Sequence, residues 1–498
     1  MVSSSSIGSS AFYKKIINFC NHIAEPYQIV AICQADDYAI ETPSSKSTIE
    51  VLVVIRGFQP RLMSYVRVID GRNFVFFAID QWIFERDVDR GFLGEALARF
   101  LIFPYTGLVN SNYLWLQEVI LKKRLVLELL ENIVVSYPEF SYSMRIKPEY
   151  FMYEVILSRI RLFPPMAYGA HSFLNGDVNK DKVALVLRGY NEALKQLEKE
   201  GFIQYQNGDI TMYPTFVDAS KNPKVRFTNI IKNAPRALFS SLFGIFPQML
   251  NFLSQNADAF LRFQMLPWRN EFDFEKSFVN PQRYIFVPTT QGLVSLADKV
   301  DIRGYVQRVL SANYDKIEVK EFGGVLNDVY LIQARNSHSE KKVLVKRFKD
   351  LSGFKWFPLS MWSIGARSFA LMGKSRLERE CAINGFLSSQ GFNVPQIFHV
   401  SANERLVFME FLEGENLSSA IKRIAKANDN SIIDPELNLI LQVGKTYAKV
   451  HALGVALGDT KPDNILVDPK GKILLIDFEQ ASRNGDKEGV FLLDPETG

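Results

Sequence analysis

A run of polar residues followed by two short apolar segments, close to the C-terminal end, constrains this chain more than any other feature of its sequence. Asp459, Lys461 and Asn464 come first. The apolar residues that follow are divided by the turn-forming sequence Asp-Pro-Lys-Gly at 468–471, which predicts two short strands joined by a hairpin. Asp477 ends the second strand, so we expect Asn464 and Asp477 to lie at the ends of neighbouring strands.

The residue types in this pattern suit phosphoryl transfer. Asn464 and Asp477 offer the hard oxygen ligands that Mg²⁺ prefers, and Asp459 can orient a nucleophile or accept its proton. Lys461 can neutralise charge on a transferring phosphoryl group. The alternative is a solvated turn followed by a core strand, because an Asp and an Asn occur at this spacing by chance. The hairpin context favours the catalytic interpretation.

If this segment is a catalytic loop followed by a metal-binding loop, other parts should precede it in a fixed order. Gly323 and Gly324 lie between two strand-like segments, where they would let the backbone approach a phosphate. Lys346 lies at the centre of the alternating segment 342–348 and is the candidate for binding the α- and β-phosphates. A plain hairpin and a solvated lysine are the commoner explanations of each feature alone, so the argument depends on their order along the chain.

The remaining parts of a nucleotide site follow in that order. A helix after Lys346 supplies Glu380 as the predicted partner of the lysine, because Glu380 lies just before the apolar face of that helix; Glu378 is the alternative. An apolar strand ends at Glu410 to Leu412, where backbone groups would hydrogen-bond an adenine ring. A segment with helical apolar spacing then leads directly to the candidate catalytic loop.

In this order, the motifs of residues 301–498 resemble an atypical protein kinase of the RIO class and the related small archaeal kinase of the KEOPS complex. Asn327-Asp-Val-Tyr-Leu resembles the end of the RIO phosphate loop, and Ile476-Asp-Phe-Glu-Gln resembles its metal loop. The resemblance implies a bilobal domain with an antiparallel sheet in its N-lobe and a short helical C-lobe, which binds ATP and Mg²⁺. The site residues that it implies are the catalytic Asp459 and the metal ligands Asn464 and Asp477.

The sequence departs from the RIO pattern at three points. Leu457 stands where the family usually has His, and Glu479 follows Asp-Phe in place of Gly or Pro. Only a short stretch follows Asp477, so we expect the C-terminal lobe to lack its closing helices. Neither Leu457 nor Glu479 removes a chemical group that phosphoryl transfer requires, whereas the short C-terminal stretch bears on the lobe that should support the site.

Three functions are compatible with these motifs. The first is an ATP- and Mg²⁺-dependent serine/threonine-type protein kinase or ATPase switch, which the resemblance associates with RNA or ribosome maturation. The second is a small-molecule phosphotransferase, since aminoglycoside and choline kinases have a similar catalytic loop. The third is a non-catalytic scaffold that binds ATP. The expected partners are ATP and a protein substrate that the sequence does not name.

Residues 341–379 span a long insertion between Lys346 and Glu380 and are rich in basic and aromatic side chains. Basic groups interleaved with stacking rings suit phosphate backbones and unpaired bases, so we expect RNA or ribonucleoprotein contact here. One alternative is that the aromatic rings pack on the small lobe while the charges are solvated. A surface for anionic lipid is another.

The first 140 residues are expected to form an α/β domain, with a helix at 11–24 and strands near 27–33, 49–55 and 72–79. The second of these strands resembles the acidic strand of nucleotidyltransferases. Glu50 is the only acid left on it, whereas two-metal chemistry needs paired carboxylates. We therefore expect residues 1–140 to be a degenerate, inactive nucleotidyltransferase-like domain.

The middle of the chain is expected to contain two further parts. A helix at 183–200 followed by a hairpin with an Asn207-Gly208 turn resembles a winged helix, which we assign to residues 141–220. Residues 221–300 begin with basic side chains and continue as apolar helical segments, which predicts a helical connector. With the kinase-like residues 301–498, this gives an α+β multidomain chain.

Composition adds few limits. The net charge is +4, so overall charge names no partner. Cys20, Cys33 and Cys381 have neither metal-ligand spacing nor a disulfide framework, which is consistent with a reducing compartment. The most apolar stretch, 237–253, is short and interrupted by Pro247, so it predicts no membrane span. We expect a soluble, cytoplasmic protein.

Overall fold

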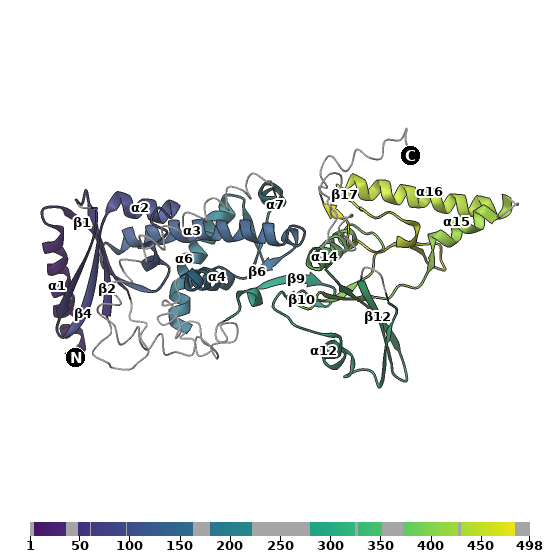
Figure 1. Cartoon of the computed structure of the whole chain (residues 1–498), viewed down its shortest axis with the longest axis horizontal. Coiled ribbons are helices and arrows are strands. Elements are labelled where there is room, and N and C mark those ends of the chain that lie inside the picture. Colours follow the sequence, from purple (N-terminus) through teal and green to yellow (C-terminus); the bar gives the residue numbers. More distant parts are fainter. Residues whose placement is uncertain are drawn as a thin grey trace. The chain divides into compact units, whose positions relative to one another are not determined.

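A computed structural model describes the chain over most of its length (Figure 1). The described residues are 4–35, 48–59, 61–95, 97–162, 180–221, 279–323, 327–350, 372–426 and 430–483. They divide between two compact units, the first formed by Met1–Val135 with Lys147–Pro281 and the second by Ser136–Ile146 with Gln282–Gly498. Among the described helices, none combines the length and apolar character needed to cross a bilayer.

The first unit begins with a five-stranded sheet in the order β3-β4-β2-β1-β5, in which β2 and β4 are parallel and the other neighbours are antiparallel. The elements are α1 (Ser4–Ala24), β1 (Gln28–Ala35), β2 (Thr48–Arg56), β3 (Leu62–Ile69), β4 (Arg72–Asp80) and β5 (Tyr105–Val109). Strand β2 is central, and Val51 to Ile55 are buried on both of its faces, which explains its continuous apolar sequence. Helix α1 packs on one face through Ile16 and Cys20. The three expected strands are confirmed, whereas β3 was not predicted.

Glu50, the single acid left on the nucleotidyltransferase-like strand, lies on β2. Its Oε2 is 2.8 Å from Nη2 of Arg99. The carboxylate is therefore neutralised by a side chain of the same unit. The identity of this unit as a degenerate nucleotidyltransferase stays a prediction.

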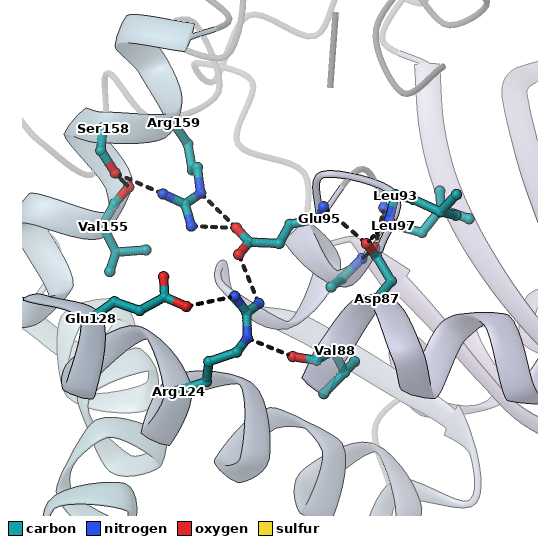
Figure 2. Close-up of polar contacts among 11 residues, drawn as sticks. Asp87, Val88, Leu93, Glu95, Leu97, Arg124, Glu128, Val155, Ser158 and Arg159 are labelled. Atoms are coloured by element: carbon teal, nitrogen blue, oxygen red, sulfur yellow. Dashed lines mark hydrogen bonds and ion pairs between the residues drawn. The ribbon is translucent and has the colours of Figure 1, made fainter. Parts of the chain in front are cut away.

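A buried network of charges holds the loop after α2 (Gln81–Arg90) in the first unit (Figure 2). Glu95 accepts hydrogen bonds from Arg124 at 2.7 Å and from Nε of Arg159 at 2.8 Å. The carboxylate of Asp87 accepts from the backbone N–H groups of Leu93 at 2.7 Å and Glu95 at 3.0 Å, as well as from two later residues of the loop. These charges satisfy one another and the loop backbone, so the network is explained by its structural role.

The rest of the first unit is mainly helical. Its elements are α2 (Gln81–Arg90), η1 (Ala98–Leu101), α3 (Ser111–Ser136), α4 (Pro148–Leu162), α6 (Lys180–Lys199), β7 (Ile203–Gln206), β8 (Asp209–Met212) and α7 (Pro214–Ser220). The predicted helix and hairpin are confirmed as α6 and β7–β8. Asn207 and Gly208 both have positive φ, 53° and 85°, as a tight two-residue hairpin turn requires. The winged-helix assignment stays a prediction.

The helical connector expected at 221–300 lies largely outside the described residues. Its described end contains only one short 3-10 helix, η4 (Pro281–Tyr284), and then β9 (Ile285–Thr289) and β10 (Gly292–Ser295) form an antiparallel hairpin. Gly292 has φ of 122°, a conformation in the turn that favours glycine and interrupts any helix. Strand β9 also pairs with β6 (Arg145–Ile146) in the second unit.

The predicted antiparallel sheet of the kinase-like N-lobe is present in the second unit. Its five strands run in the order β11-β12-β13-β15-β14, and all neighbours are antiparallel. They are β11 (Lys316–Glu321), β12 (Asn327–Arg335), β13 (Glu340–Phe348), β14 (Ile397–Ser401) and β15 (Leu406–Glu410). Val343 and Val345 of β13 face a core that contains Tyr305 and Phe408. Because side chains alternate along a strand, Lys346 points to the opposite face.

Helix α14 (Gly373–Ser389) lies between β13 and β14 in the chain. A smaller, mainly helical part follows the sheet. Its elements are β16 (Glu415–Asn416), α15 (Leu417–Lys426), α16 (Asn430–Ala452), β17 (Val455–Ala456), η7 (Pro462–Asn464), β18 (Ile465–Val467), β19 (Ile473–Leu475) and β20 (Ser482–Arg483). Strands β18 and β19 form the predicted hairpin, and Gly471 takes φ of 76° in its turn. The sequence predicts that the C-terminal lobe lacks its closing helices. Residues 484–498, on which this prediction depends, lie outside the described residues.

Candidate active site

Three charged side chains from distant parts of the sequence meet at the inner face of the kinase-like sheet. Lys346 of β13 places its Nζ 3.2 Å from Oε1 of Glu380 on α14 and 3.0 Å from Oδ1 of Asp477. The side chain of Glu380 is only 1% exposed and that of Lys346 is 12% exposed. The predicted partner Glu380 therefore meets the lysine, whereas Glu378 has its partners elsewhere.

The burial of these groups perturbs their protonation. Burial alone would lower the pKa of Lys346, but the carboxylates of Asp477 and Glu380 raise it further, and the net pKa is well above its usual range. Burial raises the pKa of Glu380 to about 7, against the opposing effect of the Lys346 ammonium. For Asp477 burial raises the pKa, but Lys346 and Lys461 outweigh it and hold the net pKa below its usual range. Lys346 is therefore held as a cation that faces two acidic side chains.

The candidate catalytic loop and metal loop lie against each other. The N–H of Ile476 donates to the backbone oxygen of Asn464 at 3.0 Å. Gly458 has φ of 75° and approaches the backbone of Gln480 so closely that a Cβ would lie 2.9 Å from its carbonyl carbon. Asp477 itself has φ of 67°, which is unusual for a residue with a side chain and is a form of strain found at functional sites.

Asp459, Asn464 and Asp477 line one small pocket together with Tyr447 and Phe478 and three neighbouring apolar residues. The Nδ2 of Asn464 donates to the backbone oxygen of Asp459 at 3.0 Å, so its amide oxygen is the atom that could bind a metal. The strand ends thus bring the two predicted metal ligands to one pocket.

The residues of this pocket fit Mg²⁺ of the kind that is held partly by a nucleotide. Within the described ranges, no group of three or more His, Cys, Asp or Glu side chains could hold a metal ion alone. Mg²⁺ usually keeps several waters and is bound by one or two carboxylates together with substrate phosphates. Asp477 and Asn464 supply an oxygen set of that size.

Lys461 lies beside the candidate catalytic carboxylate. Its Nζ is 2.8 Å from Oδ2 of Asp459, and both side chains are partly exposed, at 50% and 37%. The hydrogen bond to Asp459 raises the pKa of Lys461 further. A phosphoryl acceptor can therefore reach the Asp459 carboxylate, and Lys461 is a cation next to it.

The predicted glycine turn and the predicted adenine-binding segment are described only in part. Gly323 has φ of 69° and open space where a Cβ would lie, whereas Gly324 lies outside the described residues. The N–H of Glu410 donates to the oxygen of Gln396 at 2.8 Å, so this group is already used within the sheet. Leu412 follows the end of β15 and is the better candidate for a hinge donor.

Sequence reasoning treated Glu479 only as a departure from the RIO pattern, but it joins three elements of the site. It is buried, and it accepts from Nδ2 of Asn327 at 2.6 Å and from Nη1 of Arg376 at 3.3 Å. Arg376 is fully buried at the start of α14, and Asn327 begins β12. An acid in place of Gly or Pro was the available signal, but its partners are too distant in sequence for any local pattern to name them.

Much of the basic insertion, residues 351–371, lies outside the described residues. Several of the described basic side chains of 341–379 form ion pairs with acidic side chains of the same unit. Lys342 pairs with Glu413, Lys349 with Asp328, and Arg376 with Glu479. The RNA-contact hypothesis therefore depends on the part of the insertion that is not described.

Comparison with known proteins places a kinase-like domain in this part of the chain. The profile of the ABC1 atypical kinase-like domain matches residues 378–489, which include Glu380, Asp459, Asn464 and Asp477. The C-terminal region contains an atypical protein-kinase-like domain. The N-terminal assignments gain no support from this match, because it begins at residue 378.

Individual relatives are similar over limited stretches. The KEOPS complex subunit Bud32 of Pyrococcus abyssi is 30% identical over 105 residues, which cover 21% of this chain and 44% of that protein. The serine/threonine-protein kinase PknD of Chlamydia abortus is 27% identical over 190 residues, covering 36% of this chain and 18% of the other. A crystal structure of the Rio2 kinase of Chaetomium thermophilum in an ADP/Mg²⁺-phosphoaspartate complex has a TM-score of 0.24 at 15% identity, covering 40% of this chain and 59% of that one. The chain thus spans less than half the length of these two curated relatives.

Proposed function

We propose that the chain is an ATP- and Mg²⁺-dependent phosphotransferase, either a serine/threonine-type protein kinase or an ATPase switch. The observation that carries this proposal is the pair of contacts made by Lys346 with Glu380 and Asp477, next to the pocket shared by Asp459 and Asn464. Lysine, glutamate, two metal-ligand oxygens and a carboxylate base are the groups that phosphoryl transfer uses for positioning and charge neutralisation.

Each residue has a defined task in this proposal. Lys346 binds the α- and β-phosphates while Glu380 holds its ammonium in place. Asp477 and the amide oxygen of Asn464 would hold Mg²⁺, which would offset the negative charge of the phosphates. Asp459 orients the hydroxyl or water nucleophile, and Lys461 stabilises negative charge on the group in transfer.

The test compares Mg-ATP turnover and Mg-ATP binding in the unaltered protein and in Asp459→Asn. We expect turnover to fall by about 10²–10⁴-fold, the usual contribution of a positioned acid or base, while binding is retained. Turnover that survives the substitution would contradict the assigned role of Asp459. Binding without turnover in the unaltered protein would favour the ATP-binding scaffold, and transfer to a small hydroxyl compound would favour the small-molecule phosphotransferase.

A role in RNA or ribosome maturation is a finer proposal, supported by the basic and aromatic sequence of residues 341–379. Co-purification at moderate salt followed by nucleic-acid sequencing tests it. Replacing Lys355 and Trp356, which lie within the insertion, should reduce the recovered RNA several-fold. Recovery of no RNA with the unaltered protein would refute the proposal.

A further inference from the structure

A short segment of the second unit, Ser136–Ile146, contacts the helix that carries Glu380; we name it the docked segment. Oε1 of Glu378 on α14 accepts hydrogen bonds from the backbone N–H groups of Glu139 at 2.6 Å and Phe140 at 3.1 Å. Glu378 is only 3% exposed. The ammonium of Lys374, also on α14, lies 4.0 Å from the ring centroid of Tyr137. The docked segment is therefore held to α14 by a buried, charge-assisted contact.

The docked segment also contacts the chain just after the metal loop. The backbone N–H of Arg483, in β20, donates to Oε2 of Glu139 at 3.3 Å. The Arg483 guanidinium lies 4.3 Å from the ring centroid of Tyr142 and 3.8 Å from that of Phe386 on α14. One segment thus contacts both the helix that bears Glu380 and the strand that ends the Asp477 loop.

Glu378 and Glu380 lie on different sides of α14, so the docked segment and Lys346 contact the same helix from different sides. Successive residues of an α-helix are separated by about 100°, so Glu378 and Glu380 point in nearly opposite directions around the helix axis. Glu380 meets Lys346 on one side, and Glu378 meets the docked segment on another. A rotation or shift of α14 therefore cannot change one contact without disturbing the other.

We propose that the docked segment positions the active site, because Glu378 and Glu139 hold α14 and β20 where Glu380 and Asp477 can meet Lys346. The inference rests on the proposed function and adds to it a set of positioning residues outside the nucleotide site. Glu378 and Glu139 touch no reacting atom in this account, and they act only through α14 and β20.

The experiment uses the full chain and two independent readouts. The first is the rate at which a thiol reagent labels Cys381, which lies next to Glu380 and is buried at 5% exposure; the labelled residue is identified by mass spectrometry. The second is Mg-ATP affinity and turnover. Glu318→Ala, at a partly exposed glutamate of β11, is the matched control, and thermal unfolding verifies that each variant is folded.

In Glu378→Ala we expect Cys381 labelling to accelerate at least tenfold and turnover to fall about tenfold. Glu378→Gln should retain most of both properties, because its amide oxygen still accepts the two N–H bonds. In a Glu380→Gln background, Glu378→Ala should change turnover less than twofold, because it acts through the same pair. Glu139→Ala supplies the same labelling test if Glu378→Ala fails to fold.

The two readouts separate the failure of this inference from the failure of the proposed function. Unchanged Cys381 labelling in folded Glu378→Ala and Glu139→Ala would overturn the positioning role whatever the ATP results are. Equal losses of turnover from Glu378→Ala in the unaltered protein and in the Glu380→Gln background would also overturn it, because an unrelated structural defect is additive. Accelerated labelling in a chain that neither binds nor turns over Mg-ATP would refute the proposed function and, with it, the assignment of a catalytic consequence to the docked segment.

Discussion

Replacing Gly458 by alanine tests whether the close contact between the catalytic loop and the metal loop matters for turnover. A Cβ at this position would lie 2.9 Å from the carbonyl carbon of Gln480 and still closer to its oxygen. Carbon atoms in contact are normally about 3.5–4.0 Å apart, so the two loops must separate by roughly 0.5–1 Å. The neighbour is backbone, so it cannot rotate away as a side chain would.

Two effects should therefore appear together in Gly458→Ala. The positive φ of 75° costs a residue with a Cβ about 1–2 kcal/mol of unfolding free energy, before any clash is counted. The separation of Asp459 from Asp477 should lower turnover by about 10²-fold, the cost of a misplacement near 1 Å in a site that acts by positioning. Mg-ATP binding should fall much less, since Lys346 and Glu380 lie on other elements.

Gly471→Ala is the matched control. Gly471 has nearly the same φ, 76°, but a Cβ there would meet nothing within 4 Å. We expect the same conformational cost of about 1–2 kcal/mol in urea unfolding, with turnover unchanged. Equal turnover in the two alanine variants would refute the argument, because it would show that the approach of the two loops contributes nothing beyond the strained backbone.

Three further predictions concern the charged groups. Lys346→Met should weaken Mg-ATP binding at least tenfold by calorimetry, because it removes the cation that is proposed to bind the phosphates, and unchanged affinity would contradict this role. The raised pKa of Glu380, about 7, means that the folded chain holds this proton more tightly than the unfolded chain. Its contribution to stability is therefore largest below pH 4.5 and is lost as pH rises through 7, so urea unfolding at pH 5 and pH 8 should differ less in Glu380→Gln than in the unaltered protein. Glu479→Ala should lower the free energy of unfolding by about 3–5 kcal/mol, because it leaves the buried Arg376 without this partner. A loss below about 1 kcal/mol would contradict that account.

The parts of the site that could be predicted from the sequence are those that local spacing encodes. Asp459, Asn464 and Asp477 lie within one hairpin-forming segment, so the pattern of strands and turn places them together. The pairing of Lys346 with Glu380 joins residues 34 positions apart, and it was predicted from the order of the parts rather than from spacing.

The rest depends on contacts that no local pattern records. Glu378 reaches the backbone of Glu139 across 239 positions, and Asn327 reaches Glu479 across 152. In sequence, only the position of Glu380 just before the apolar face of its helix favoured it over Glu378 as the partner of the lysine. The edge strand β3 escaped prediction because its apolar side chains are largely exposed, as with Val68 at 61%, so its pattern carries little of the usual signal of burial.

The charges around Lys346 explain why a site of this kind can be stable without its nucleotide and still respond to it. One buried carboxylate would be enough to offset the charge of a buried lysine, but Lys346 has two acidic partners, Glu380 and Asp477. Asp477 is the more exposed of the two, at 26% against 1%, and it has the positive φ. It is therefore the partner whose exchange costs least, and phosphates that take its place at Lys346 would release its carboxylate to the pocket that it shares with Asn464. Glu380 is fixed by a second bond from the N–H of Phe478 at 2.7 Å, so it stays with the lysine throughout.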